Sequence, residues 1–181
     1  MDYNACIKYL FPEATPIADY ALAVPLTGKP EITVWNTGKL GPQPTVAQLE
    51  AAWPAAQLQA VQTIQKAIVT KSCVSAMTGG FLSSALGSAR TYPSTLTDQH
   101  NLSGSVIASL LPNLPSGWTT SFWCMDSTGA WAFTPHTAAQ IQQVGMDGKA
   151  WITAQQEKLA SLNAQIEVAT TVSAVQSVIW S

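Results

Sequence analysis

The spacing of apolar residues predicts a long helix over residues 45–79. Apolar side chains recur there at intervals of three and four positions, which places them on one helical face. They are Leu49, Trp53, Ala56, Ala60, Ile64, Ala67 and Ile68. Thr45 and Gln48 have the spacing of a capping box and predict the start of the helix. We expect a break or kink near Trp53, because Pro54 lies inside the pattern, and an end at the paired Gly79 and Gly80.

Strand patterns occur on both sides of this helix. Residues 31–37 (EITVWNT) alternate in strand fashion and follow a short helical segment that Pro12 closes. Residues 38–44 are rich in Gly and Pro and predict a linker. Residues 81–94 predict two short strands that turn at Gly87, and residues 118–134 predict a second hairpin around the turn DSTG. The second hairpin is rich in aromatic residues, as strands usually are.

Three further helices are expected. The first covers residues 97–111 from a Thr or Asp cap, and the second, long one starts at Thr134–Pro135 and ends near Ala169. We expect a bend in the long helix near Gly145 to Gly148 and a short closing helix at residues 173–180.

Strands and helices thus run in separate blocks, which is the pattern of an α+β fold. We expect three parts: an N-terminal segment with short strands (1–44), a connecting helix (45–79), and a C-terminal α+β domain (80–181) with two hairpins and a long helix.

Composition narrows the classes of partner. The 181 residues are 47% hydrophobic and only 10% charged, with a net charge of −2, so the expected surface is neutral and hydrogen-bonding. Nucleic acid and anionic membranes are poor candidates because no block of Lys or Arg occurs. We expect no membrane insertion and no signal peptide, since apolar runs are short and the N-terminus is acidic with an early lysine.

No residue combination predicts catalysis, a cofactor or a metal site. Asp98 and His100 are two positions apart and would point in different directions on a helix, so Asp98 is better explained as a helix cap. No GxSxG motif presents a nucleophile to His100. We expect His136 to be a solvated residue in the first turn of the long helix. Three distant cysteines, Cys6, Cys73 and Cys124, favour buried reduced thiols over disulfides or zinc, and indicate synthesis in a cytoplasm.

Two apolar features have both a structural and a functional interpretation. Trp118, Trp123 and Trp131 lie on the second expected hairpin, where alternation would set Trp123 apart from the other two. Such aromatic residues usually pack in a core or a protein interface, and a sugar-binding platform is the less favoured interpretation. A stripe with heptad-like spacing lies on the long helix and either docks on its own domain, the commoner case, or forms an oligomerisation seam. Its residues are Ile152, Leu159, Leu162 and Ile166.

The order of segments in the C-terminal part resembles a domain of unknown function common in tail genes of tailed bacteriophages. The resemblance covers about residues 75–181, through GGFLSSALG, YPSTLTDQHNL, the tryptophan-rich hairpin and LASLNAQIEVATTVSAVQSVIW. The matching positions are Gly80, Phe81, Ser83, Leu86, Gly87, Tyr92, Asp98, Gln99, Asn101 and Leu102. The first 55 residues resemble small phage proteins encoded beside tail-fibre and baseplate genes.

This resemblance implies a phage tail module in which the polar residues of YPSTLTDQHNL cap and buttress a turn and helix. The expected function is that of a tail-fibre assembly chaperone that acts in the host cytoplasm, with a fibre or baseplate protein as partner. The alternative is a structural tail, baseplate or fibre component retained in the virion. A homo-oligomer, dimer or trimer, joined through the helical seam is a further expectation, and a small hydrolase centred on His100 is the least favoured alternative.

Overall fold

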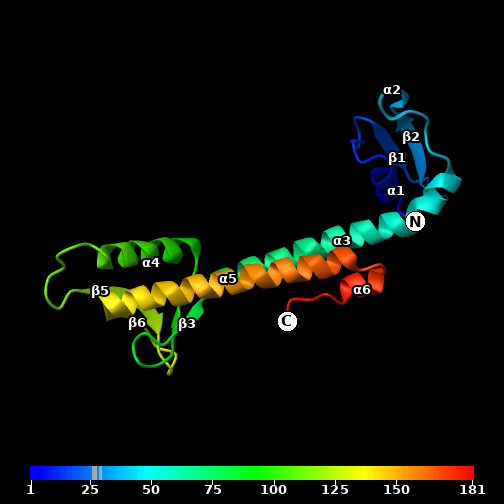
Figure 1. Cartoon of the computed structure of the whole chain (residues 1–181). Helices are drawn as coiled ribbons and strands as arrows, with labels where there is room; N and C mark the ends of the chain where they lie inside the picture. Colours follow the sequence, from blue (N-terminus) through cyan, green and yellow to red (C-terminus); the bar gives the residue numbers. More distant parts are fainter. Residues whose placement is uncertain (26–27, 29) are drawn as a thin grey trace. The chain divides into compact units, whose positions relative to one another are not determined.

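The computed structural model describes residues 1–25, 28 and 30–181 and has two compact units (Figure 1). One unit comprises residues 1–67 and 164–179, and the other comprises residues 68–163 and 180–181. Helices α3 (Val46–Thr78) and α5 (Ala138–Val168) contribute residues to both units. Two antiparallel sheets combined with long helices confirm the predicted α+β class. The expected three-part division at residues 44 and 79 stays a prediction.

The first unit contains a two-stranded antiparallel sheet and several helices. Its elements are α1 (Tyr3–Leu10), β1 (Tyr20–Ala23), β2 (Glu31–Trp35), α2 (Thr37–Leu40), the first part of α3, the end of α5, and α6 (Val172–Gln176). Asp2 caps α1 by accepting a hydrogen bond from the backbone N–H of Ala5 (3.1 Å). The predicted helical segment and the strand at 31–37 are therefore present, whereas the expected linker at 38–44 begins inside the short helix α2.

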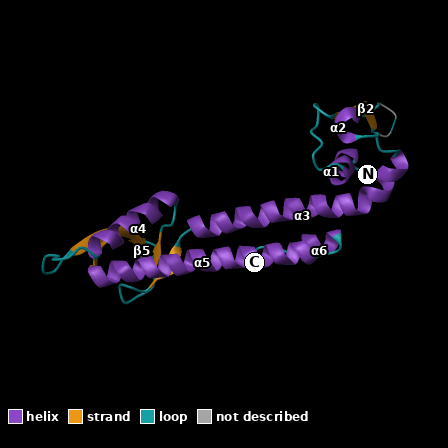
Figure 2. Cartoon of the chain, turned by 45° about the horizontal axis from the view of Figure 1, so that its top comes forward, coloured by secondary structure: helices purple, strands orange, loops and turns teal. Residues whose placement is uncertain are grey.

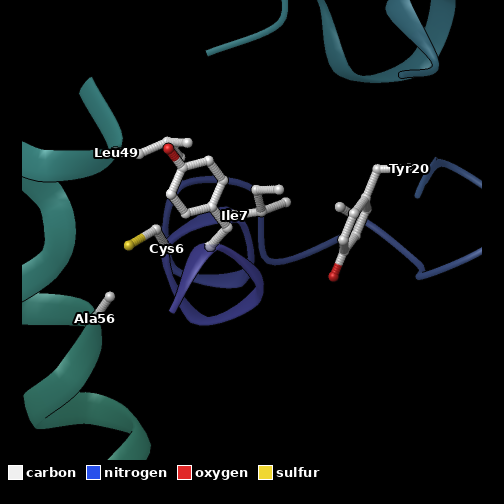
Figure 3. Close-up of a cluster of buried hydrophobic side chains, with 7 residues drawn as sticks. Cys6, Ile7, Tyr20, Leu49 and Ala56 are labelled. Atoms are coloured by element: carbon white, nitrogen blue, oxygen red, sulfur yellow. The ribbon is translucent and has the colours of Figure 1, made fainter. Parts of the chain in front are cut away.

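The core of the first unit is built around α1. Figure 3 shows Cys6 pointing from α1 toward Leu49 and Ala56 of α3, while the ring of Tyr20 lies on the other side of α1 near Ile7. All five side chains are essentially inaccessible to solvent. In this unit, the predicted apolar face of α3 therefore packs against α1.

Glutamine side chains of α3 bind the C-terminal elements of the same unit. The Nε2 group of Gln62 donates to the backbone carbonyls of Ile166 (3.0 Å) and Ala169 (3.2 Å), which are left free at the end of α5. The Nε2 group of Gln65 donates to the carbonyl of Val178 at 2.7 Å in a buried position. These bonds satisfy carbonyl groups that would otherwise lack partners near the end of the chain.

The second unit is a four-stranded antiparallel sheet with two helices against one face. The strand order is β3 (Phe81–Ser83), β4 (Arg90–Tyr92), β5 (Thr119–Met125) and β6 (Trp131–Thr137). Helix α4 (Leu96–Ser109) and helix α5 run side by side against the strands (Figure 2). Both predicted hairpins, the predicted helix between them and a long helix after the second hairpin are present. Side chains from the strands and both helices form one buried core: Phe81, Tyr92, Leu102, Phe122, Cys124, Ile141 and Val144.

Two glycines allow α5 to approach its neighbours closely. A Cβ atom at Gly145 would lie 2.7 Å from Cγ2 of Val106 in α4, and one at Gly148 would lie 2.9 Å from Cζ of Phe81 in β3. Both distances are shorter than van der Waals contact allows. These positions were expected to bend the helix, but α5 continues through them without interruption, so the glycines serve close packing.

One further expectation about helices is met in part and another needs correction. Helix α3 is continuous at Pro54, so the expected break is absent, but its ribbon bends near the N-terminal end, in keeping with the expected alternative of a kink (Figure 1). Thr134–Pro135 does not open the long helix, because both residues belong to β6 and α5 begins at Ala138. The actual cap is Thr137, whose hydroxyl accepts from the N–H of Gln140 at 3.3 Å.

Candidate functional site

The polar segment after β4 forms a helix cap. Thr95 is the N-cap of α4, and its N–H donates to Oδ2 of Asp98 (3.0 Å) while its hydroxyl accepts from the N–H of Asp98 (3.3 Å). The side chain of Gln99 reaches back and donates to the carbonyl of Ser94 at 2.9 Å. Asp98 is therefore one half of a capping box, as its sequence position indicated. His100 and Asn101 are exposed on the next turn of α4, and Leu102 is buried in the core.

The glycine and aromatic positions of the first hairpin have backbone and packing roles. Gly80 has a φ of +106°, and a Cβ there would lie 2.9 Å from the carbonyl oxygen of Tyr92, so only glycine fits. Gly87 turns the hairpin with a φ of +86°. Phe81 stacks on Tyr92 with ring centroids 5.6 Å apart, and Leu86 packs at the edge of the same core.

His136 lies in β6 and is completely buried, which contradicts the expectation of a solvated helix residue. Its Nδ1 lies 2.8 Å from the carbonyl of Thr134, and its Nε2 lies 2.8 Å from the hydroxyl of Tyr92. Because a carbonyl only accepts, Nδ1 carries the proton and Nε2 accepts from the tyrosine. Burial lowers the pKa of His136 and raises that of Tyr92, so the pair stays neutral and acts as a buried crosslink between strands.

The outer face of the sheet, which we define by Trp123, Phe133, Trp131 and Leu82, is apolar and exposed. Trp123 lies opposite Phe133, and Trp131 is opposite Met125 in the same ladder. Because side chains alternate, these residues point away from the buried core. Phe133 retains 70% of its accessible surface and Leu82 retains 68%. All outward positions of these four strands, which lie in the described part of the chain, are uncharged.

Two tryptophans on the outer face are held against each other. The rings of Trp123 and Trp131 are stacked, with centroids 6.2 Å apart and planes 14° apart, and the ring of Phe133 lies 4.9 Å from that of Trp123. The expectation that Trp123 would be set apart from the other two tryptophans is therefore wrong for Trp131 and holds for Trp118. Side chains do alternate along each strand, as expected. Which residues of the two strands share a face depends on their pairing register, which the turn sets, and this register brings Trp123 beside Trp131. Trp118 lies against the core instead.

The residues of the predicted seam are distributed over two kinds of environment. Leu162 is 9% exposed and Ile166 is fully buried within the single chain. Leu159 is half-buried, and Ile152 lines an apolar groove of about 740 Å³ between α4 and α5 together with Val106 and Met146. The chain itself thus covers the C-terminal half of the seam, and its use as a partner interface stays a prediction.

A buried carboxylate organises the polar part of the first unit. Asp19 accepts from Nζ of Lys39 at 2.6 Å, from Nδ2 of Asn36 at 3.2 Å and from the N–H of Thr15 at 2.8 Å. The hydrogen bond from Lys39 is the main reason that the pKa of Asp19 is lowered. With its hydrogen-bonding capacity used inside the unit, Asp19 joins β1, β2 and α2 and has a structural role.

Among the described residues, no group of three or more His, Cys, Asp or Glu side chains is arranged to hold a metal ion. In the same part of the chain, no helix combines the length and the apolar character needed to cross a bilayer. The outer face of the sheet therefore remains the surface feature that most needs a functional explanation.

Two family models match this chain. Residues 60–178 match the model of a domain of unknown function, DUF4376. The chain belongs to this family. Residues 3–61 match the model described as XkdW protein, and together the two matches identify the chain as phage-related. Searches among curated proteins and among solved structures gave no match.

The DUF4376 region contains both hairpins, α4 and α5, and hence the outer face, the Tyr92–His136 pair and the capping box. The XkdW-like region contains α1, β1, β2, α2 and the start of α3. Sequence reasoning identified the aromatic hairpin but assigned no site residue to it. The sequence does contain a signal for this surface. If the two strands are paired about the turn, the odd-numbered residues Trp123, Trp131 and Phe133 lie on the same face of the hairpin.

Proposed function

We propose that this phage-related protein is a tail-fibre assembly chaperone that binds fibre subunits through the outer face of its four-stranded sheet. The observation that supports this proposal is an exposed, uncharged aromatic surface built on a rigid sheet. Large exposed apolar surfaces usually mark interaction sites, and aromatic residues are enriched in protein interfaces. Stacking of Trp123 on Trp131 restricts both rings before a partner arrives, which lowers the entropic cost of binding.

The composition is in keeping with this role. A chaperone that must release its client benefits from a surface without strong charge pairs, and only 10% of the residues are charged. The two family matches together mark the chain as phage-related, and the proposal requires a client that exposes apolar surface before it assembles. The proposal includes no enzymatic activity, so replacement of the exposed His100 by Ala is expected to leave function intact.

Co-expression with a phage tail-fibre protein tests the proposal. We expect the wild-type chain to increase the yield of soluble, assembled fibre. A Trp123→Thr, Phe133→Thr double variant should lose this effect, because truncation of an aromatic anchor in an interface costs about 2 kcal/mol or more, or about thirtyfold in Kd. Threonine suits a strand and both positions are exposed, so the fold should be kept.

Val34→Thr is the matched control, since it also replaces an exposed apolar strand residue by threonine but lies on β2 of the other unit. Equal fibre yields with the double variant and the wild type would contradict the proposal. The second candidate, a structural component retained in the virion, uses the same surface against a tail or baseplate protein. Mass spectrometry of purified virions separates the two, because a chaperone should be absent from them.

A further inference from the structure

One edge of β5 lacks a strand partner over most of its length. On the side away from β6, its pairing with β4 consists of the single residue pair Thr91–Met125. After Tyr92 the chain leaves the sheet and enters α4 at Leu96. Residues 119–123 of β5 therefore face an open edge, although the strand lies third in the sheet order, between β4 and β6.

The hydrogen-bond parity of the hairpin shows which backbone groups face this edge. The N–H of Asp126 donates to the carbonyl of Ala130 (3.0 Å), so the pairs at even positions of β5 exchange bonds with β6. In an antiparallel ladder the alternate residues direct both their N–H and C=O the other way. Thr119, Ser121 and Trp123 thus direct these groups to the open edge. Within the described chain, no other backbone or side-chain group binds those of Ser121 or Trp123.

The outer edge of β6 provides a contrast. Pro135 has no N–H to offer on that edge, and the N–H of Thr137 is already bound to Oε1 of Gln140 at 2.9 Å. Proline and local capping are common means by which proteins protect an edge strand from unwanted pairing. The open edge of β5 has no such protection, and its central residue, Ser121, lies directly opposite the Pro135 that blocks β6.

A groove of about 760 Å³ lies between this edge and α4. Ser121 and Trp123 line it from the strand, and Gly104, Ser105 and Ala108 line it from the helix. A Cβ atom at Gly104 would meet no atom within 4 Å, so the helical wall is set back from the strand. Small helix residues thus leave room where a neighbouring strand would lie, about 4.8 Å from β5.

We propose that the open edge of β5 binds an extended segment of a partner polypeptide by β-strand addition. The N–H and C=O groups of Thr119, Ser121 and Trp123 require a strand with the complementary alternation of donors and acceptors. In such a strand, every second side chain would point toward Gly104 and Ala108, where there is room only for a small residue. The side chains between them would lie beside Trp123 and should be apolar. The site does not depend on the chaperone role, since any protein with such a segment fits it.

A second copy of this chain is a poor occupant. Its β6 edge is interrupted at Pro135 and at the capped N–H of Thr137, its β3 strand has only three residues, and its own β5 edge shares a groove with α4. A single extended segment meets none of these obstacles.

Hydrogen exchange on the full chain tests the proposal. The probe is a synthetic peptide of about nine residues with alternating serine and valine and a lysine at each end, added at up to millimolar concentration. In the free protein, the amides of Ser121 and Trp123 should exchange rapidly. At a peptide concentration about nine times its Kd, their exchange should slow about tenfold, because about nine-tenths of the sites are occupied. Amides on β6 should not change.

Two variants make the test specific. Ser121→Pro removes the outward N–H and should abolish the protection, whereas Ser121→Val keeps this N–H, changes only the side chain and should preserve protection. Gly104→Leu should fill the groove and also abolish binding, and it covers the case in which the proline variant fails to fold. No protection by peptide, or equal protection in Gly104→Leu, overturns the proposal. Protection that rises with protein concentration alone identifies a second copy as the occupant and overturns it as well.

Discussion

Replacement of Gly148 by alanine tests the close packing of α5 on the sheet. The added Cβ would lie 2.9, 3.1 and 3.3 Å from three carbons of the Phe81 ring. That ring is 4% exposed and is stacked on Tyr92 at 5.6 Å, so it has little room to move away. Either α5 or the ring must shift, and both are parts of the same buried core.

The expected magnitude follows from two opposing effects. Alanine in a helix interior is favoured over glycine by about 0.8–1 kcal/mol, whereas overpacking a core costs about 1–3 kcal/mol. Gly104→Ala is the matched control, because Gly104 is also inside a helix but its Cβ would meet no atom within 4 Å. The propensity gain cancels in the comparison, so the control should be more stable than Gly148→Ala by about 1–3 kcal/mol.

Urea unfolding followed by circular dichroism measures this difference, provided that both variants unfold with the same slope. In thermal unfolding, each kcal/mol corresponds to about 2–4 °C for a protein of this size. Gly104→Ala should unfold later than the wild type. A Gly148→Ala variant that is stabilised as much as the control would refute the close contact between α5 and Phe81.

Further predictions concern polar and apolar positions in the core and the helix cap. Tyr92→Phe leaves Nε2 of His136 without a donor and should lower the free energy of unfolding by about 1–3 kcal/mol in urea titrations. Burial lowers the pKa of His136, so the unfolded chain binds more protons than the folded chain does. The free energy of unfolding should therefore fall as the pH drops below 6.5. The urea midpoint of His136→Gln should vary less with pH than that of the wild type. Thr95→Ala removes the cap of α4 and should cost about 0.5–2 kcal/mol by the same assay. Leu162→Asp should unfold the chain or lower its stability by at least about 1.5 kcal/mol, as measured by circular dichroism, whereas a folded but smaller species in light scattering would support an oligomer seam instead.

Local sequence signals predicted most of the secondary structure. Capping residues located the start of α3, and alternation together with turn residues located both hairpins. These signals succeed because they act between neighbours along the chain. A capping role for Asp98 was likewise predicted from its place in an expected first turn beside Thr97, although the N-cap is Thr95, three positions before Asp98.

Features that depend on distant residues were missed. Thr134–Pro135 has the local form of a helix start, but pairing of β6 with β5 extends the strand to Thr137. His136 is buried because Tyr92, forty-four positions earlier, supplies a hydrogen bond that no local pattern reveals. The packing role of Gly145 was missed, and a bend was expected instead, because its packing partner, Val106, belongs to another helix. The open edge of β5 likewise arises from the shortness of β4, which only the assembled sheet shows.

The absence of charge on the outer face of the described sheet has a kinetic consequence. A partner that approaches Trp123 and Phe133 is not accelerated by long-range attraction, so its association should proceed at the basal rate of about 10⁵–10⁶ M⁻¹s⁻¹ and vary little with salt. Differences in affinity among partners then lie mainly in their dissociation rates. The residence time of a partner on the stacked tryptophans, rather than the frequency of encounters, would decide which phage protein stays bound in a crowded cell.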